Sequence, residues 1–182
     1  MSDIKNQFIF KIVVVGDSAV GKTSLIKNFT QGTFKEDYIQ TIGAQLSNYE
    51  QILEDNKIQL FLWDIAGQDN YHFLRPAFYK GSRAAIVVYS LESSNHGKRS
   101  LAHVDEWYDD IKEHCGEIPI ILFGNKVDLV KGKKIKEKKV KKIMKKRSFI
   151  GYYKTSAKTG EGVIDAFNAL IKQLYEKYKD IN

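Results

Sequence analysis

The 182-residue sequence contains one cysteine, two prolines and two tryptophans. With Cys115 alone no internal disulfide can form, which favours a reducing compartment. No uninterrupted apolar stretch approaches the roughly 18 residues of a membrane-spanning helix. The first apolar run contains Lys11 and leads into a glycine turn, so it lacks the cleavage site of a secretory signal peptide. These absences predict a cytoplasmic protein, and the length and 43% hydrophobic content fit one globular domain over residues 1–182.

Acidic residues are also scarce in one segment. Between Lys131 and Arg147 the sequence has eleven Lys or Arg and a single acidic residue, Glu137. The rest of the chain carries 18 basic and 21 acidic residues, so the net charge of +7 comes from this segment. Proteins built around nucleic acid usually spread cationic groups over a broad face. We therefore do not expect nucleic acid as a partner.

Apolar runs alternate along the chain with stretches of helical periodicity. The runs rich in Val, Ile and aromatic residues lie at 8–15, 58–65, 84–90, 118–124 and 149–155. Such continuous apolar character is typical of strands buried on both faces of a parallel sheet. A further strand is predicted at 44–53, joined to the next by a hairpin turn, EDNK. Apolar residues recur at helical spacing at 22–30, 100–114, 138–146 and 161–178. The alternation predicts an α/β fold.

The stretch GDSAVGKT at 16–23 matches the phosphate-binding pattern G-x-x-x-x-G-K-[ST] between a predicted strand and a predicted helix. Gly16 and Gly21 free the backbone so that successive N–H groups can point at phosphate oxygens. Lys22 would neutralise the β- and γ-phosphates, and the Thr23 hydroxyl would ligate Mg²⁺. A plain strand-to-helix turn is the alternative. ATPases, GTPases and kinases share the motif, so it predicts a phosphate site without identifying the base.

Two later motifs predict the base. FGNKVDL begins at the end of the run at 118–124, and TSAKTG begins at the end of the run at 149–155. Guanine offers N1–H and an exocyclic amine, and the Asp128 carboxylate can accept hydrogen bonds from both. Adenine has an acceptor at N1 and no such amine, so it would leave a desolvated carboxylate unpaired. That penalty supports discrimination of about 10⁴–10⁵.

Together, in this order, the three motifs resemble those of the Ras superfamily of small GTPases over essentially the whole chain. The resemblance implies a P-loop small G domain, with a six-stranded, mostly parallel sheet, one antiparallel strand and about five helices. It also implies a monomer that binds GTP or GDP with Mg²⁺ and hydrolyses GTP. Asn125 would support the loop and base, the Lys126 stem would cover the ring, and the Ala157 N–H would meet the guanine carbonyl. Ser156 and Lys158 would buttress that turn. The remaining expected nucleotide contacts are Ser18, Ala19, Val20 and Ser24.

The stretch WDIAGQDN at 63–70 is similar to the second switch of the family. By this resemblance Asp64 would hold Mg²⁺ through a water molecule. The N–H of Gly67 would sense the γ-phosphate, and Gln68 would orient the attacking water. Both switches would be released when hydrolysis removes the γ-phosphate.

The stretch FKEDYIQTIGA at 34–44 is similar to the first switch. Thr41 would complete the Mg²⁺ shell, Phe34 would pack against guanine, and Tyr38 would lie over the phosphates. No arginine lies between Gly32 and Leu46, so this loop supplies no arginine finger, which is worth about 10³–10⁵ in rate. We therefore expect slow intrinsic turnover and an activating protein that brings the missing cation.

Four stretches run parallel to segments of Rab proteins: GDSAVGKTSL, DYIQTIGAQL, WDIAGQDNYHFLRPAFYKGSRAAIVVYS and TSAKTGEGV. Within the superfamily the sequence is therefore similar above all to Rab proteins. The aromatic triad by which Rab proteins bind effectors would fall on Leu46, Trp63 and Phe78. Only the tryptophan is the usual residue, so the identity of the effector does not follow. The sequence ends in YEKYKDIN without a cysteine, so a Rab-type prenylated tail is not expected. A truncated chain and a GTPase without a lipid there both stay open.

The basic segment permits two interpretations. Val140, Ile143 and Met144 stand at i, i+3 and i+4 and predict a helix with one packed side and lysines on the other. A solvated helix face is the simpler interpretation. The alternative is reversible contact with an anionic membrane, worth about 1 kcal/mol per Lys or Arg near the bilayer.

The predicted function is a switch that hydrolyses GTP and regulates trafficking or signalling. Its expected partners are an effector, an exchange factor and a GTPase-activating protein, all at the switch segments. A nucleotide-loaded scaffold with negligible hydrolysis is one alternative, although intact Thr41, Gly67 and Gln68 speak against it. An ATP-dependent phosphotransferase is another, disfavoured by Asp128.

Overall fold

The computed structural model describes residues 4–34, 41–130 and 137–181. Within these residues six strands form one sheet in the order β2-β3-β1-β4-β5-β6. The strands are β1 (Gln7–Val15), β2 (Ala44–Leu53), β3 (Asn56–Ile65), β4 (Ala84–Ser90), β5 (Ile120–Asn125) and β6 (Phe149–Lys154). All neighbours run parallel except β2 and β3, which are antiparallel. The predicted mostly parallel sheet with one antiparallel strand is confirmed.

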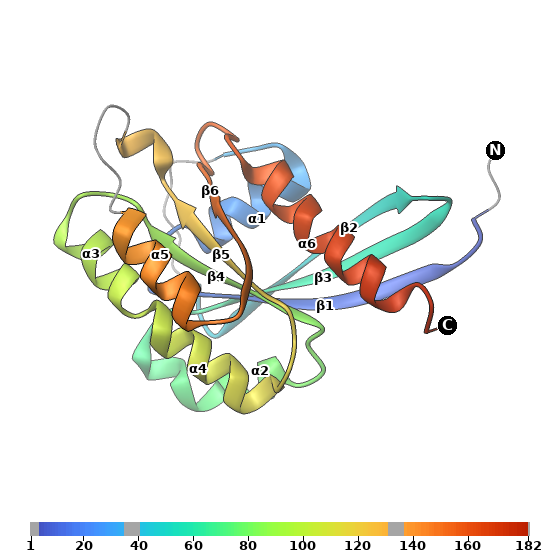
Figure 1. Cartoon of the computed structure of the whole chain (residues 1–182), viewed down its shortest axis with the longest axis horizontal. Coiled ribbons are helices and arrows are strands. Elements are labelled where there is room, and N and C mark those ends of the chain that lie inside the picture. The colour runs from blue at the N-terminus through green and yellow to red at the C-terminus, as the bar shows by residue number, and fades with distance from the viewer. Residues whose placement is uncertain (1–3, 35–40, 131–136, 182) are drawn as a thin grey trace.

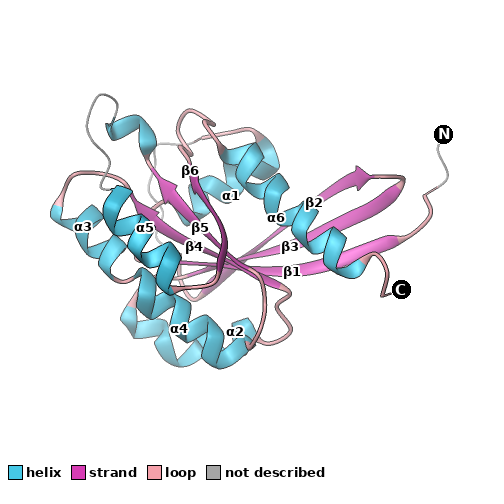
Figure 2. Cartoon of the chain, viewed as in Figure 1, coloured by secondary structure: helices cyan, strands magenta, loops and turns pink. Residues whose placement is uncertain are grey.

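Helices cover both faces of the sheet. They are α1 (Lys22–Gln31), α2 (Arg75–Tyr79), α3 (Asn95–Ala102), α4 (Val104–Cys115), α5 (Glu137–Lys146) and α6 (Val163–Tyr178). Two 3₁₀ helices, η1 (Asp69–Leu74) and η2 (Val127–Val130), lie in the connections. Helices α1 and α6 lie on one face of the sheet, and α2 to α5 lie on the other (Figures 1 and 2). The chain therefore folds into three layers.

Side chains of the central strands alternate between the two halves of the core. In β1, Ile12 and Val14 pack in the half under α1 and α6, whereas Val13 and Val15 pack in the half under α4. The strand β4 is buried along its entire length. Strands covered on both faces cannot alternate between apolar and polar residues, which explains the continuous apolar runs of the sequence.

The predicted hairpin is present. Glu54 (φ 49°) and Asp55 (φ 61°) occupy its two turn positions between β2 and β3. Two consecutive positive φ angles are typical of the type I′ turn, whose twist matches that of the strands it joins. The turn lies at the right of Figure 1, and the hairpin is joined to α6 by the Asn56 side-chain amide, which donates to the Tyr175 hydroxyl at 3.0 Å.

Two helices occupy the region where the sequence predicts one helix at 100–114. The first, α3, begins five residues earlier because the Ser94 hydroxyl caps it by accepting a hydrogen bond from the Gly97 N–H at 3.1 Å. It ends before His103, which separates it from α4. The His103 imidazole contacts the phosphate-binding loop, as described below, so the break brings a side chain to the site.

The Phe167→Ala variant should lower the free energy of unfolding by about 3–5 kcal/mol. Phe167, on α6, is 1% exposed and stacks on Phe29 of α1 with ring centroids 4.1 Å apart and planes at 5°. It also contacts the edge of Phe123 in β5. Truncation leaves a cavity where α1, α6 and the sheet meet. Urea unfolding of the GDP complex measures the loss. Ile164→Ala, at a 50% exposed position of α6, should change stability by less than about 0.5 kcal/mol.

Candidate functional site

The predicted motifs meet at one edge of the sheet. The parallel strands β1, β3, β4, β5 and β6 all end there, and each is followed by a segment that reaches the site. Ligands of open α/β sheets bind in the crevice outside the carboxyl ends of the strands. The topology therefore brings together residues that lie far apart in the sequence.

The phosphate-binding loop, residues 16–23, requires glycine at both of its glycine positions, because a Cβ atom does not fit there and the backbone has a positive φ angle. Gly16 has φ 138°, and a Cβ atom there would overlap the carbonyl oxygen of Val88 in β4. Gly21 has φ 99°, and a Cβ atom there would overlap the Asn125 side-chain amide. Both angles disfavour residues other than glycine. The loop is thus seated between β4 and the FGNKVDL motif at the end of β5.

Lys22 is buried in the loop, with only 6% of its surface exposed. Its ammonium group donates hydrogen bonds to the carbonyl oxygens of Gly16 at 2.8 Å and Asp17 at 2.9 Å. Burial lowers the pKa of Lys22 to about 8, although the carboxylates of Asp64 and Asp17 oppose the shift. The cation is therefore held in the loop by backbone carbonyls, at the start of α1.

Three oxygen-bearing side chains converge beside Lys22. The Thr23 hydroxyl lies 3.1 Å from that of Thr41 and donates a hydrogen bond to Asp64 Oδ2, while Thr41 donates to the same oxygen at 3.2 Å. Asp64 is 2% exposed, and its Oδ1 has no hydrogen-bond partner among the described residues. Burial raises the pKa of Asp64, whereas the charge of Lys22 opposes the shift. Hydroxyl and carboxylate oxygens are the ligands that Mg²⁺ prefers, so this set fits the metal.

The second switch lies directly against the phosphate-binding loop. A Cβ atom at Gly67 would overlap the backbone of Gly16, Asp17 and Ser18. The preceding residue, Ala66, donates a backbone hydrogen bond to the carbonyl oxygen of Gly43 at 2.9 Å, close after Thr41. This hydrogen bond joins the two predicted switch stretches, 34–44 and 63–70. Gln68 follows in extended conformation and lines a cleft with Gly67 and Ala19.

Asn125 joins the base-reading segment to two other loops. Its Nδ2 donates to the Val20 carbonyl oxygen at 2.9 Å, and its Oδ1 accepts from the Ala157 N–H at 3.1 Å and from the Thr155 hydroxyl at 3.3 Å. Asn125 is 1% exposed. The expected supporting role of Asn125 has a structural basis in these bonds. They also occupy the Ala157 N–H, which the resemblance assigns to guanine.

Asp128 lies in η2 beside the last motif. Its Oδ1 accepts a hydrogen bond from the Ser156 hydroxyl at 2.6 Å, and that hydroxyl accepts from the Thr159 N–H at 3.1 Å. Lys126 has φ 66°, and its ammonium group lies 3.4 Å from Glu92 Oε2. The structure thus brings the FGNKVDL and TSAKTG motifs into contact, and the Ser156 hydroxyl fixes the orientation of the Asp128 carboxylate.

The remaining predicted residues differ in how far the structure places them. Tyr38 lies outside the described residues. Phe34 precedes that gap with 37% of its surface exposed. Ser18 and Ala19 lie in the phosphate-binding loop, Ser24 lies in the first turn of α1, and Lys158 is exposed in the loop after β6.

Sequence reasoning missed a group of side chains that hold the loop from outside. Asp17 accepts hydrogen bonds from His103 Nδ1 and from Trp107 Nε1, each at 2.9 Å. His96 Nε2 lies 2.8 Å from the carbonyl oxygen of Ser18. The i, i+4 spacing of His103 and Trp107 predicts a common helix face. No local pattern indicates that this face meets a loop some 90 residues earlier.

Comparison with known proteins agrees with this geometry. The Ras family model matches residues 11–176. The chain is 34% identical over 174 residues to the Ras-related protein Rab-5A of Dictyostelium discoideum, covering 96% of this chain and 85% of that protein. It is also 34% identical over 178 residues to the Ypt/Rab-type GTPase ypt7 of Schizosaccharomyces pombe, covering 94% and 85%. The chain therefore belongs to the Ras family of small GTPases, as a Rab-like member that binds GTP or GDP with Mg²⁺ and hydrolyses GTP.

Proposed function

We propose that this GTPase switches between two conformations, hydrolyses GTP slowly when alone, and regulates trafficking or signalling through effectors that bind its GTP state. The observation that carries the proposal is the convergence of Thr41, Asp64 and Gly67 on the phosphate-binding loop. These residues belong to the two predicted switches. The contact of Thr41 with Mg²⁺ and that of Gly67 with the γ-phosphate would exist only in the GTP state, so hydrolysis would release both segments.

Each group at the edge of the sheet has one role in this proposal. Lys22 binds the β- and γ-phosphates as a preformed cation, and the loop N–H groups surround them. Thr23, Thr41 and Asp64 would hold Mg²⁺, which supplies charge compensation for the phosphates when bound. Gln68 orients the attacking water. Asp128 selects guanine, and Asn125 keeps the phosphate and base loops in register through its bonds to Val20 and Ala157.

We base the proposed slow rate of GTP hydrolysis on where the arginines of the chain lie. The first switch carries none between residues 32 and 46. Arg75, next to the cleft of Gln68, packs over the Trp107 ring at 4.1 Å and lies 3.8 Å from Asp110. It is buried and held by these groups. We infer that an activating protein supplies the missing cation, which is worth about 10³–10⁵ in rate.

The proposal is tested by extracting the nucleotide that copurifies with the protein and then timing γ-phosphate release from loaded GTP. We expect GDP or GTP, and a single-turnover rate on the order of 10⁻⁴ to 10⁻³ per second. A rate of tens per second would contradict the need for an activating protein. No measurable hydrolysis, together with tight GTP binding, would support the alternative of a GTP-loaded scaffold.

An apolar surface beside the switches fits an effector. Leu46 in β2 is 46% exposed and is the register partner of Trp63 in β3, whose ring lies 5.8 Å from that of Phe78. Ile42 and Phe73, in or next to the switch segments, are 77% and 75% exposed. Large apolar side chains clustered on a surface mark an interaction site. We propose that the GTP-state effector covers this surface.

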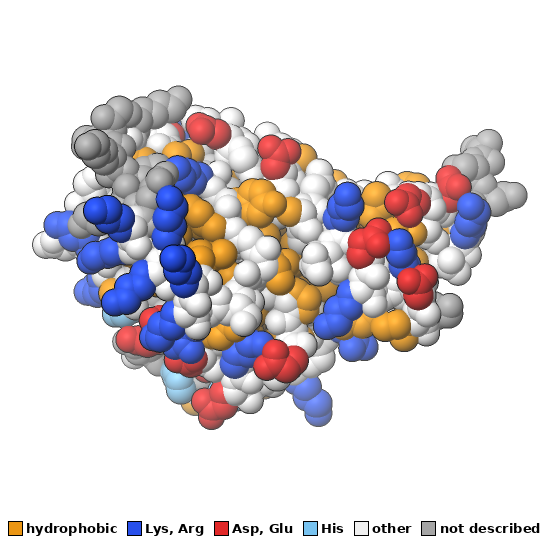
Figure 3. All heavy atoms as spheres, in the orientation of Figure 1, with side chains coloured by type: hydrophobic (Ala, Val, Ile, Leu, Met, Phe, Trp, Pro, Cys, Tyr) orange, Lys and Arg blue, Asp and Glu red, His pale blue; other side chains and the backbone are white. Residues whose placement is uncertain are grey.

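We also propose that the lysines of α5 attach the protein reversibly to an anionic membrane surface. Val140 packs in the core, with Ile143 and Met144 against it. Lys146 and Arg147 bind Asp105 of α4, and Arg147 also binds Asp109. The other described lysines of α5 are exposed, and no hydrogen bond or ion pair joins them to another described residue: Lys138, Lys139, Lys141, Lys142 and Lys145. Blue side chains gather over α5 at the left of Figure 3. No helix among the described residues is long and apolar enough to cross a bilayer.

Replacement of Lys138, Lys142 and Lys145 by Gln should weaken binding to phosphatidylserine-containing vesicles about a hundredfold. These lysines share one helix face at i, i+4 and i+7, and each contributes about 1 kcal/mol near an anionic surface. Vesicle co-sedimentation measures the effect. The matched control replaces three exposed lysines elsewhere by Gln: Lys80, Lys172 and Lys177. Equal binding of the unmodified protein to anionic and neutral vesicles would refute the membrane contact.

A further inference from the structure

His96, in the first turn of α3, contacts the phosphate-binding loop. Its Nε2 lies 2.8 Å from the carbonyl oxygen of Ser18, and its Nδ1 lies 2.7 Å from Glu92 Oε1. A carbonyl and a carboxylate only accept hydrogen bonds. A neutral imidazole carries one N–H and can satisfy one of them, whereas the protonated ring donates to both. Both ring nitrogens of His96 thus face hydrogen-bond acceptors.

Glu92 continues this contact to the other end of the nucleotide site. Its Oε2 lies 3.4 Å from the ammonium group of Lys126, in the base-reading motif. Ser18, His96, Glu92 and Lys126 thus form a continuous polar series, here called the His96–Glu92 bridge. Burial alone would raise the pKa of Glu92, yet hydrogen bonds from His96 and Ser94 and the charge of Lys126 hold it below its usual value. The bridge joins the phosphate loop to the residues expected around the base.

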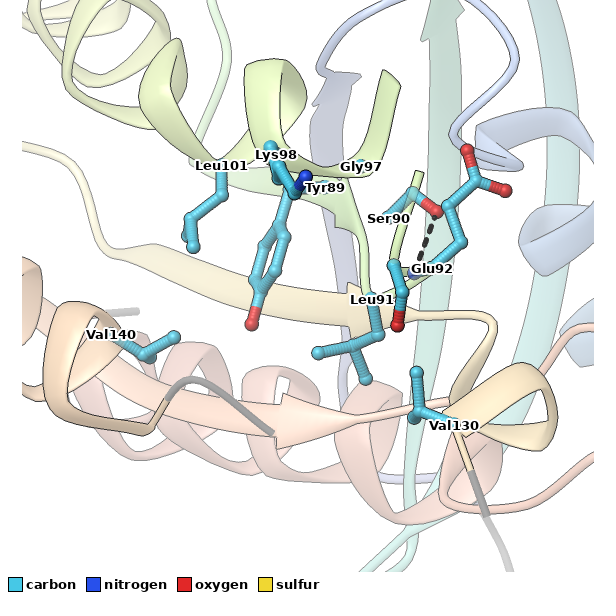
Figure 4. Close-up of a pocket in the computed structure, with 10 residues that line it drawn as sticks. Tyr89, Ser90, Leu91, Glu92, Gly97, Lys98, Leu101, Val130 and Val140 are labelled. Atoms are coloured by element: carbon cyan, nitrogen blue, oxygen red, sulfur yellow. Dashed lines mark hydrogen bonds between the residues drawn. The ribbon is translucent and has the colours of Figure 1, made fainter. Parts of the chain in front are cut away.

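The local fold fixes the two members of the bridge relative to each other. The Ser94 hydroxyl, which caps α3, also donates to Glu92 Oε1 at 2.9 Å. A Cβ atom at Gly97 would overlap the Glu92 carbonyl oxygen, so α3 begins directly against this segment. Figure 4 shows Glu92 where the chain leaves β4, with its backbone N–H donating to the Ser90 hydroxyl at 3.3 Å. The His96 and Glu92 side chains are 28% and 20% exposed, so solvent reaches their contact only in part.

We propose that His96 is a positioning residue of the nucleotide site, and that loss of a proton from its ring loosens the phosphate-binding loop and speeds the release of GDP. The proposal rests on the placement of the nucleotide over this loop in the proposed function. Histidine changes charge between about pH 5 and 8. When one N–H is lost, either Ser18 or Glu92 faces a lone pair in place of a donor. The other charged or titratable side chains along the bridge and its cleft are Asp17, His72, Arg75, Arg99, His103, Glu106, Asp110 and Lys126.

The experiment measures release of a fluorescent GDP analogue into excess GDP, at constant Mg²⁺, from about pH 5.5 to about pH 8. We expect release from the unmodified protein to be about three- to tenfold faster at the upper end, the effect of one hydrogen bond. His96→Gln keeps one amide donor for the Ser18 carbonyl and cannot change charge. Its release should be independent of pH and as fast as that of the unmodified protein at the upper end.

Two further histidine variants separate the sources of any pH dependence. His114→Gln, whose Nδ1 contacts the Asp110 carbonyl oxygen at the end of α4, should keep the full dependence. His103→Gln should also keep the dependence. The Nδ1–H of a neutral His103 is enough to satisfy Asp17, so a change in the charge of His103 breaks no contact with the loop. Thermal unfolding of each GDP complex verifies that the variants are folded.

The proposal is wrong if release from the unmodified protein does not change with pH. It is equally wrong if His96→Gln retains the dependence, or if His103→Gln abolishes it. Failure to take up GDP at any pH would overturn the nucleotide site itself. Measurable but pH-independent release would overturn only the role of His96.

Discussion

The Asp128→Asn variant is expected to bind GTP about 10⁴-fold more weakly, while it gains affinity for xanthosine triphosphate. The carboxylate can accept hydrogen bonds from both guanine donors, whereas an amide presents a donor to one of them. A buried donor facing a donor loses two hydrogen bonds and desolvates both groups. In xanthine a carbonyl oxygen replaces the exocyclic amine of guanine, so the amide of the variant regains a partner. The hydrogen bond from Ser156 at 2.6 Å holds the side chain in the required orientation.

Competition between nucleotides measures this change directly. The displacement of labelled GDP by each triphosphate gives the ratio of affinities, and the gain for the xanthine nucleotide separates altered recognition from misfolding. Asp165→Asn, at an exposed acidic residue of α6, provides the matched control and should leave all affinities within about twofold. If Asp128→Asn kept its GTP affinity within tenfold, Asp128 would not be the residue that selects guanine.

Most of the fold was predictable because its signals are local. Continuous apolar runs indicate strands covered on both faces, and β4 occupies the predicted run at 84–90. The hairpin followed from its turn, EDNK, between two strand patterns. The division between α3 and α4 was not predictable. It depends on the cap at Ser94 and on His103, whose side chain binds Asp17 from 86 residues away.

The phosphate-binding part of the site was also predictable, because its signal is local as well. Glycines, Lys22 and the hydroxyl of Thr23 stand at fixed spacing in one motif because a phosphate needs them together. By contrast, the His96–Glu92 bridge is only partly local. Glu92 and His96 stand four residues apart, whereas Ser18 and Lys126 come from distant segments, and only the tertiary fold places the histidine against the loop carbonyl. The histidines of the chain carry no ligand pattern, so the contact of His96 with the Ser18 carbonyl could not be predicted from the sequence.

The Gly67→Ala variant is expected to lower GTP hydrolysis about 10²-fold and to abolish the conformational response to GTP, while GDP affinity changes by less than about threefold. The added Cβ atom would overlap the backbone of the phosphate-binding loop. That loop is held by Asn125 and by the close approach of Gly16 to β4, so the second switch must move instead. Gln68 would move with it, and a displacement of about 1 Å in a catalytic group costs on the order of 10²-fold in rate.

Tryptophan fluorescence distinguishes this variant from one that lacks only the catalytic amide. Trp63, the first residue of the second switch, packs against Phe78, and Trp107 donates to Asp17 of the loop, so both indoles report on the site. Exchange of GDP for a non-hydrolysable GTP analogue should change the fluorescence of the unmodified protein. Gln68→Leu should retain that change and lose hydrolysis, because the Gly67 N–H is still in place. Gly67→Ala should lose both. A full fluorescence change in Gly67→Ala would mean that the second switch senses the γ-phosphate through another group, since the backbone at this position could then not be its contact.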